Sequence, residues 1–458
     1  MSGTPDVLPS PGGRETATCR RTTNTTSLSP FLASRLGASL LTLFSSQNQR
    51  HHTMKFYSLA LLLATASAFT VPYSHSSSRS SNMRLYSSTT PEKTAVETAA
   101  VSSSKLEPEF QQALEKAQGL IEASIGEEQK HLLALLLYFM REYFEANQAS
   151  YKAGNTQLCS PDAVANRFLD GIQLGMTYGM GKTKYRFGVS HTAMRGNPEL
   201  EEGNTRDYYA FGCDFFRPCM NLEESVILGK ENLDKAFEQI KNGENVVFLA
   251  NHQSEADPQV VSCLLEKVGY GPQAEQVTYV AGHKVTTDPL AIPFSMGRNL
   301  VCIHSKKHID SDPDTKPLKQ KQNLLAMGGM LNKLKEGGCC LWVAPSGGRD
   351  RRNVETGEVP IADFDSKTID MFRLMGNKSK VPTHYYPLAM VTYDLCPPPD
   401  YIEAGVGEQR NVRFVPVGIA CGAEVESVGG LEKRHEFCDN AFAACQADYE
   451  RLLAELKP

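Results

Sequence analysis

A histidine and an aspartate that could act together lie five residues apart in the segment NHQSEADP, residues 251–258. A turn at this spacing would bring the carboxylate of Asp257 to one imidazole nitrogen of His252, fix the tautomer and stabilise the imidazolium. The other nitrogen could then remove a proton from a substrate hydroxyl, which would itself be the nucleophile. Taken alone, the spacing fits a structural histidine better, so the neighbouring motifs decide between the two interpretations.

Two arginines stand in a second segment, PSGGRDRR at residues 345–352, which directly follows the apolar run CCLWVA. Glycines let the backbone turn tightly at the end of a strand, so Arg349 and Arg351 could point into the same cleft. Guanidinium groups match phosphate in geometry and keep their charge. An isolated Arg-x-Arg would be a basic surface turn, but its place after an apolar run favours a phosphate site.

A third polar segment, HSKKH at residues 304–308, directly follows the apolar run NLVCI and supplies Lys307 and His308. If each apolar run is a strand of one sheet, an imidazole–carboxylate pair and several cations come to the same edge of that sheet. This combination suits an alcohol substrate that bears a phosphate group.

The elements that would position these motifs follow from the hydrophobic pattern. From about residue 215, short apolar runs alternate with segments of helical periodicity, and we expect helices at 233–241 and 319–336. The expected strands are 245–250, 277–281, 299–303, 339–344, 383–391 and 412–417. Strands separated by helices predict an α/β fold with a mainly parallel or mixed sheet covered on both faces, and active sites in such sheets lie at the carboxyl ends of strands.

Helical periodicity dominates the region before this sheet. Apolar residues recur there at helical spacing, as in Phe110, Leu114, Ala117 and Ile121. Pro161 follows a serine and predicts the first position of a later helix. We therefore predict a small helical bundle domain over residues 105–200 and a larger α/β catalytic domain over residues 201–458.

Residues 1–104 differ from the rest and have the composition of a targeting or disordered region. Residues 54–68 have the basic start, apolar stretch and small-residue end of a signal peptide. Residues 69–90 are rich in serine, contain arginine and lack acidic residues, like a transit peptide. The aromatic Phe69 directly after the cleavage site resembles the two-part targeting sequences of algae with secondary plastids. A plastid location is thus predicted, with an ordinary disordered N-terminus as the alternative.

Composition limits the partners and the compartment. The formal net charge of −5 gives no whole-molecule attraction to nucleic acid, so an anion would be bound locally. None of the 12 cysteines belongs to a Cys-x-x-Cys pair, which argues against a zinc site and favours buried thiols in a reducing compartment. No apolar run after Ala68 approaches the roughly 20 residues of a membrane span, so we expect no transmembrane helix, while peripheral contact with a membrane stays open.

The three polar segments together resemble the glycerolipid acyltransferases, whose hallmark is Asn-His-x-x-x-x-Asp-Pro, and in particular the soluble plastid glycerol-3-phosphate acyltransferases. The resemblance covers about residues 106–458. It implies a helical bundle before an α/β domain, and transfer of an acyl group from the thioester of acyl-carrier protein or coenzyme A to the sn-1 hydroxyl of glycerol 3-phosphate. This would be the first step of plastid phospholipid synthesis, in the stroma, with no metal or cofactor.

Carried over by position, the resemblance implies that His252 is the catalytic base and Asp257 its orienting partner. It implies that four residues bind the phosphate: Lys307, His308, Arg349 and Arg351.

An acyl chain also needs an apolar tunnel and its carrier a basic surface. Leu290, Ile292, Phe294 and Met296 are candidates for the tunnel, although an ordinary core explains them better. A basic cluster for the carrier, or equally a solvated helix face, is formed by Lys316, Lys319 and Lys321.

Three alternatives stay open at this point. An acyltransferase for 1-acylglycerol 3-phosphate would use the same motifs, but such enzymes usually carry membrane-embedded segments. A metal-dependent phosphoesterase would use His252 and Asp257 as ligands, and would need further ligands at the strand ends. A non-catalytic protein that binds acyl-carrier protein would have no use for an intact histidine–aspartate pair.

Overall fold

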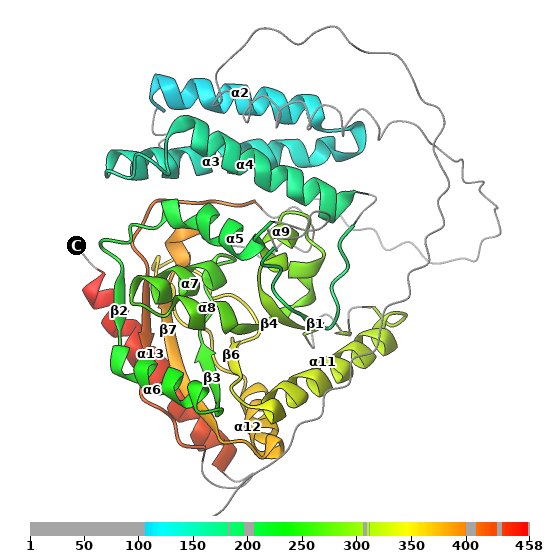
Figure 1. The fold of residues 1–458 in the computed structure, drawn as a ribbon, viewed down its shortest axis with the longest axis vertical. Helices are drawn as coiled ribbons and strands as arrows, with labels where there is room; N and C mark the ends of the chain where they lie inside the picture. The colour runs from blue at the N-terminus through cyan, green and yellow to red at the C-terminus, as the bar shows by residue number, and fades with distance from the viewer. Residues whose placement is uncertain are drawn as a thin grey trace, which may run out of the picture. The chain divides into compact units, whose positions relative to one another are not determined.

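An eight-stranded mixed sheet forms the centre of the α/β part in the computed structural model (Figure 1). The strand order is β1-β5-β4-β6-β3-β7-β8-β2, and the five neighbouring strands from β5 to β7 are all parallel. Their carboxyl ends therefore meet at one edge of the sheet. The structure describes residues 106–181, 184–196, 206–305, 309–310, 312–399, 409–427 and 433–456.

The strands are short and mostly buried. Their bounds are β1 Ser190–His191, β2 Val226–Leu228, β3 Asn245–Ala250, β4 Thr278–Gly282, β5 Asn299–Ile303, β6 Cys340–Val343, β7 Thr383–Val391 and β8 Gly418–Cys421. Within the described residues, the pairs β1–β5 and β7–β8 are antiparallel, whereas β2 pairs with β8 in parallel. The predicted mixed α/β fold is confirmed.

Helices cover both faces of this sheet. Successive residues of β3 point to opposite sides, so that Val246 and Phe248 join one apolar core and Val247 and Leu249 join another. On the first side lie α5 Tyr208–Phe216, α6 Lys230–Lys241, α7 Asp257–Lys267, α8 Gly271–Gln276 and α9 Ile292–Met296. On the second side lie α11 Lys316–Glu336, α12 Ser366–Ser379 and α13 Arg434–Glu455. Every residue of β3 is buried, as expected for a strand covered on both faces.

Three helices form a separate layer near the start of the described chain (Figure 1). They are α2 Pro108–Ser124, α3 Lys130–Lys152 and α4 Pro161–Gly175, and a π-helical turn, η2 Met176–Met180, extends the last of them. This layer packs on α5 through aromatic side chains: the rings of Tyr143 and Phe215 stack at 4.5 Å, and the Tyr143 hydroxyl donates to the Phe215 carbonyl at 2.9 Å.

Shorter 3₁₀ turns connect these elements at η1 Glu127–Gln129, η3 Arg217–Cys219, η4 His283–Thr286 and η5 Tyr393–Leu395.

The predicted boundary between the two domains lies near residue 200. The strand Ser190–His191 pairs with β5 of the sheet although it precedes that residue. The domain boundary near residue 200 stays a prediction. The predicted signal peptide at 54–68 and transit-like segment at 69–90 lie outside the described residues.

One strand was predicted at the wrong place. The segment 412–417 forms only an isolated bridge from Val415 to Met220, and the strand β8 begins at Gly418. Pro416 explains the difference, because proline has no N–H to donate to a ladder.

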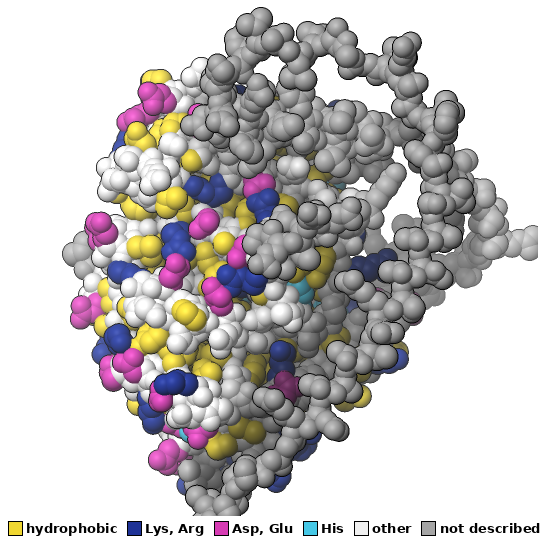
Figure 2. Space-filling model, viewed as in Figure 1, with side chains coloured by type: hydrophobic (Ala, Val, Ile, Leu, Met, Phe, Trp, Pro, Cys, Tyr) yellow, Lys and Arg dark blue, Asp and Glu magenta, His cyan; other side chains and the backbone are white. Residues whose placement is uncertain are grey.

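Charges of both signs share the visible face of the molecule (Figure 2). On the face shown in Figure 2, Lys and Arg side chains are interspersed with Asp and Glu, without an extended field of one sign. Among the described residues, none of the helices combines the length and apolar character needed to cross a membrane. Cys263, Cys302 and Cys340 are buried free thiols, as expected.

Candidate active site

The predicted histidine–aspartate pair forms in the loop between β3 and α7. Nδ1 of His252 lies 2.7 Å from Oδ2 of Asp257. The imidazole is 26% exposed and the carboxylate is fully buried, so the ring alone can meet a substrate. Asp257 is the first residue of α7 and Pro258 follows it, which suits both the helix N-terminus and a negative charge placed there.

The carboxylate of Asp257 is held on all sides by donors. Oδ2 accepts a second hydrogen bond from the Gln253 N–H at 2.9 Å, and Oδ1 accepts from the Ser254 N–H at 3.1 Å. Oδ1 also accepts from the Thr392 hydroxyl at 2.6 Å. Four donors leave the carboxylate little freedom to rotate, so the imidazole that it contacts is fixed in orientation.

The histidine loop is tied to the neighbouring strands by two buried amide side chains. Asn251 exchanges two hydrogen bonds with the backbone of Met390 in β7, at 2.7 and 3.0 Å. Gln253 accepts from the N–H groups of Thr392 and Tyr393 at 2.8 and 3.1 Å. The loop that follows β3 is thus held by the carboxyl end of β7 as well as by the hydrogen bonds within its own turn.

The segment after β6 closes the other side of the pair. The N–H of Asp350 donates to the carbonyl of His252 at 2.6 Å, and the carboxylate of Asp350 accepts from Asn251 at 2.9 Å. The ring of Trp342 stands edge-to-face against His252, with the centroids 5.7 Å apart. The first two predicted motifs therefore meet at the edge of the sheet.

Burial raises the pKa of the Asp350 carboxyl from its ordinary 3.8 to about 6, against the hydrogen bonds from Ala362 and Asn251 that lower it. The folded protein thus keeps this proton at a pH where the unfolded chain has lost it, and stability declines as the pH rises through that range.

We expect the unfolding free energy of the wild type to fall, relative to that of Asp350→Asn, by about 3 kcal/mol between roughly pH 4 and pH 7. Urea unfolding of both proteins across this range measures the difference. A difference that does not change with pH would show that Asp350 ionises in the folded state as it does in the unfolded chain.

A chain of charges extends from the histidine loop. Nη1 of Arg349 lies 3.5 Å from Oε1 of Glu255, and Nε of Arg410 lies 3.0 Å from its Oε2. Arg410 also contacts Asp288, with Nη2 2.7 Å from Oδ2. Burial by itself would raise the pKa of the Glu255 carboxyl, but Arg410 and Arg349 outweigh it and hold that pKa below its ordinary value.

The other predicted phosphate ligands are only partly placed. Arg351 donates to the carbonyl of Pro399 at 2.5 Å. Lys307 and His308 lie outside the described residues. His304, which directly follows β5, stacks on His283 at 3.7 Å. Of the four cations, the structure brings Arg349 to the histidine loop.

Several residues of the site were not predicted, namely Glu255, Asp288, Asp350, Thr392 and Arg410. Glu255 and Asp350 stand inside the quoted motifs, and Thr392 directly follows a correctly predicted strand, so each carried a signal. Arg410 is in an irregular segment and carried none. Among the described residues, no group of three or more His, Cys, Asp or Glu side chains could hold a metal ion. The phosphoesterase alternative therefore gains no ligand set from them.

The known proteins that this chain resembles in sequence are acyltransferases. A family model described as acyltransferase matches residues 228–391, which include the histidine loop and Arg349. The chloroplastic glycerol-3-phosphate acyltransferase of Arabidopsis thaliana is 36% identical over 290 residues, which are 63% of this chain and 59% of that protein. The proteins of the same name from Spinacia oleracea and Pisum sativum are each 41% identical over 219 residues, or 48% of this chain and 46% and 48% of theirs.

The chain spans about half the length of the curated relatives it matches. The resemblance predicted from the three motifs is confirmed. Among solved structures, the 1-acyl-sn-glycerophosphate acyltransferase PlsC of Thermotoga maritima covers 72% of this chain and 98% of its own, at 15% identity. Its TM-score of 0.35 is too low for an element-by-element comparison.

Proposed function

We propose that the chain transfers an acyl group from a thioester to the sn-1 hydroxyl of glycerol 3-phosphate. The match of residues 228–391 to the acyltransferase family model supports this reaction type. One observation carries the proposal: a partly exposed imidazole is oriented by a buried carboxylate at 2.7 Å, in a loop that also contacts an arginine. The relatives that bear the name glycerol-3-phosphate acyltransferase support the choice of acceptor.

His252 would act as the general base. Its Nδ1 is engaged by Asp257, so Nε2 removes the proton from the sn-1 hydroxyl as that oxygen attacks the thioester carbonyl. The C–S bond breaks when the tetrahedral intermediate collapses, and His252 returns the proton to the departing thiolate. Positioned general-base catalysis contributes about 10²–10⁴-fold. Holding the alcohol and the thioester together supplies much of the rest.

The phosphate of the acceptor would be bound by cations at the strand ends. The contact of Arg349 with Glu255, which is three residues from His252, supports this role for Arg349. We propose Arg351, Lys307 and His308 as its partners on the strength of the motifs alone. Guanidinium groups suit the task because they pair with phosphate through two parallel hydrogen bonds.

The resemblance of the motifs supports the choice of donor, and the relatives and the N-terminal composition support the location. We propose acyl-carrier protein or coenzyme A as the carrier of the acyl group and the plastid stroma as the location, reached through the segments 54–68 and 69–90. The relatives named above are called chloroplastic, which supports a plastid.

An assay of the full chain with labelled glycerol 3-phosphate and either acyl-carrier thioester or acyl-coenzyme A tests the proposal. We expect 1-acylglycerol 3-phosphate as the product and no change on adding chelator. If 1-acylglycerol 3-phosphate is instead the better acceptor, the choice of substrate is wrong. Hydrolysis of the phosphate that a chelator abolishes would favour the phosphoesterase.

Arg349→Ala and Arg351→Ala are each expected to raise KM for glycerol 3-phosphate by about 10–100-fold, the worth of one hydrogen bond to a charged group. KM for the acyl donor should change by less than about twofold, because these arginines are proposed to bind the phosphate of glycerol 3-phosphate and not the donor. Arg352→Ala is the matched control, since Arg352 pairs with Asp394 at 3.0 Å. Equal effects on both substrates would exclude phosphate binding by these arginines.

A further inference from the structure

Helix α11 exposes large apolar side chains on its outer side. Leu318, Leu324 and Leu325 are 57%, 73% and 54% exposed. They are three of the six large apolar side chains that the described residues leave exposed, and all three belong to this one helix. The opposite side of the helix is already packed, because Ala326 and Met330 join the apolar core on the second side of the sheet. Packing of the described chain therefore leaves these three leucines without cover.

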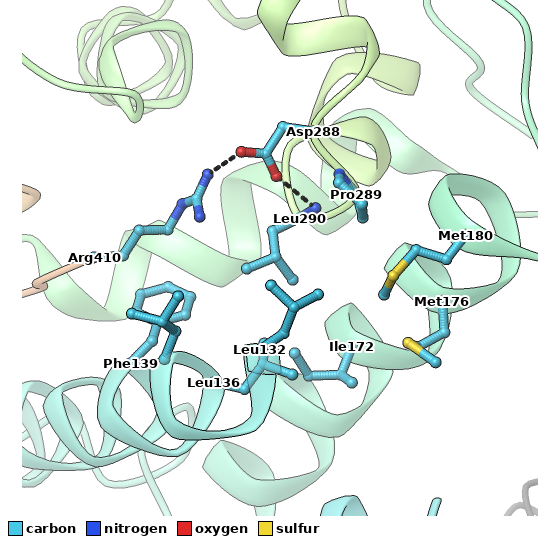
Figure 3. A pocket seen from close by; sticks show the side chains of 11 residues that line it. Leu132, Leu136, Phe139, Ile172, Met176, Met180, Asp288, Pro289, Leu290 and Arg410 are labelled. Atoms are coloured by element: carbon cyan, nitrogen blue, oxygen red, sulfur yellow. Dashed lines mark hydrogen bonds and ion pairs between the residues drawn. The ribbon is translucent and has the colours of Figure 1, made fainter. Parts of the chain in front are cut away.

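The leucines of α3 show the contrast. Figure 3 shows Leu132 and Leu136 of that helix facing Leu290 of the loop before α9. Leu136 is buried, and Leu132 and Leu290 are partly buried. The apolar run of α3 thus meets another segment of the chain, whereas among the described residues none covers the leucines of α11. Single exposed leucines need no explanation, but leucines that cluster on one helix indicate an interaction surface.

The three leucines share one face of α11 with a lysine. Seven residues make roughly two helical turns, so Leu318 and Leu325 lie nearly in line along the helix. Lys321 stands between them, three residues after the first and four before the second, and Leu324 neighbours it at a spacing of three. These four residues are the outer face of α11.

The charges of α11 favour an anionic partner. The helix contains five lysines: Lys316, Lys319, Lys321, Lys333 and Lys335. Its acidic residue is Glu336, the last residue of the helix. Three aspartates precede the helix, and one of them, Asp310, pairs with Lys316 at 2.9 Å. The outer face itself carries positive charge.

Leucines and a lysine on one helix face match the surface of a bilayer. In helices that lie in a membrane surface, apolar side chains enter the boundary between head groups and acyl chains, and lysines meet anionic head groups. The stem of Lys321 can lie along the leucines while its ammonium group stays among the head groups. A second copy of the chain fits less well, because a twofold contact through this face would bring like charges together. An acidic protein would pair with the lysines, but a bilayer also covers the leucines.

Helix α11 is attached to the edge of the sheet that forms the candidate site. Asn323 exchanges two hydrogen bonds, at 2.7 and 2.8 Å, with the backbone of His304, the residue after β5. Oε1 of Gln322 lies 2.7 Å from Nε2 of the same histidine. The carboxyl ends of β5 and β3 meet at one edge of the sheet, so α11 is held at the edge that also carries His252.

We infer that the outer face of α11 docks the protein on a bilayer that contains anionic lipids, and that the product is released there. The product of the proposed reaction, 1-acylglycerol 3-phosphate, has a hydrocarbon chain and a phosphate group, which is also the chemistry of such a bilayer. The inference rests in part on the proposed function, because that function supplies the lipid product.

The single native tryptophan allows a direct test on the full chain, because Trp342 is only 4% exposed. Leu325→Trp adds an indole on the outer face, and Leu158→Trp, the matched control, adds one at a leucine between α3 and α4 that is 40% exposed. Vesicles of phosphatidylcholine with about 30% phosphatidylglycerol, brominated in their acyl chains, should quench the added emission of Leu325→Trp by about half and leave that of Leu158→Trp unchanged. Both proteins carry the same residues 54–68, so binding through that segment would not favour one indole over the other.

Two further measurements separate the apolar from the charged part of the surface. Adding Leu318→Gln and Leu324→Gln to the Leu325→Trp protein should raise the lipid concentration for half-quenching by about tenfold or more, because two leucines no longer enter the bilayer. Vesicles without phosphatidylglycerol should need about fivefold more lipid or still more, because the lysines then meet no anionic head group. Acyl transfer from octanoyl-coenzyme A, assayed without vesicles, should stay within about twofold in all variants, because exposed side chains are replaced.

The outcomes distinguish this inference from the proposed function. Quenching that is absent at Leu325→Trp, or equal at both tryptophans, overturns the inference, and the proposed function stands if acyl transfer continues. If acidic acyl-carrier protein changes the emission of Leu325→Trp and the vesicles do not, the face binds a protein and the inference is overturned. If the vesicles quench Leu325→Trp selectively but no acyl group is transferred, docking on the bilayer is supported and the proposed function fails.

Discussion

His252→Ala is expected to lower kcat for acyl transfer by about 10²–10⁴-fold, the usual worth of a positioned general base. The reason is geometric, because Asp257 occupies Nδ1 at 2.7 Å and leaves the other ring nitrogen for the acceptor hydroxyl. Steady-state kinetics at saturating donor measure the loss. Binding of glycerol 3-phosphate, followed by calorimetry, should change by less than about threefold, since the alanine removes no group that contacts the phosphate.

His384 offers a matched control for this variant. Its imidazole also contacts carboxylate groups, although on both ring nitrogens, with Nδ1 2.6 Å from Glu424 and Nε2 3.0 Å from Glu244. It is the second residue of β7, however, and so stands at the amino end of a strand parallel to β3, across the sheet from His252. His384→Gln should keep kcat within about twofold. A His252→Ala protein with wild-type kcat would remove the imidazole from the mechanism.

The first and last residues of three buried strands could be predicted from the sequence. β3, β5 and β7 have the bounds expected from their apolar runs, because a strand covered on both faces is mostly apolar and a polar residue follows each of the three. The strand expected at 412–417 was also predicted from an apolar run, but it does not form there. Val412 and Val417 are buried, but burial does not require a ladder, and Pro416 cannot join one.

The histidine–aspartate pair was predictable because both residues stand in one short loop. Their supports were not, since they arrive from segments distant in the sequence: Thr392 reaches Asp257 from the end of β7, and Arg410 reaches Glu255 across 155 residues. Apolar periodicity indicates that strands exist, whereas side-chain hydrogen bonds between their ends depend on strand order. That order, with β7 beside β3, is what brings Thr392 to the carboxylate.

The role of Arg410 in the site could not be predicted from its neighbours in the sequence. Its surroundings in the sequence give no motif, yet it is 10% exposed and contacts carboxylates from two other segments. A buried arginine requires such partners, because its charge cannot be removed at any accessible pH. The need is evident only once the three segments are seen together.

Asp257→Asn is the second variant with a large expected effect, a loss of about 10²–10⁴-fold in kcat with little change in KM for glycerol 3-phosphate. All four partners of the carboxylate act as donors: the His252 ring nitrogen, two backbone N–H groups and the Thr392 hydroxyl. An amide nitrogen placed toward His252 would turn the imidazole to the tautomer that carries its proton on Nε2, and so block the base. Placed the other way, it would oppose the Ser254 N–H.

Asp350→Asn separates this effect from the general cost of altering a buried aspartate. Asp350 is also fully buried and hydrogen-bonded beside the same loop, but its carboxylate contacts Asn251 and Ala362 rather than the imidazole. Both variants should lose about 1–3 kcal/mol of stability at pH 4 from imperfect hydrogen bonding, measured by urea unfolding. The loss for Asp350→Asn should shrink toward neutral pH, because burial disfavours the ionised carboxylate of the wild type there. Only Asp257→Asn should lose kcat by more than about tenfold, because only there does the lost charge fix the tautomer of the base. If the two variants lose kcat equally, Asp257 supports the loop without orienting the base.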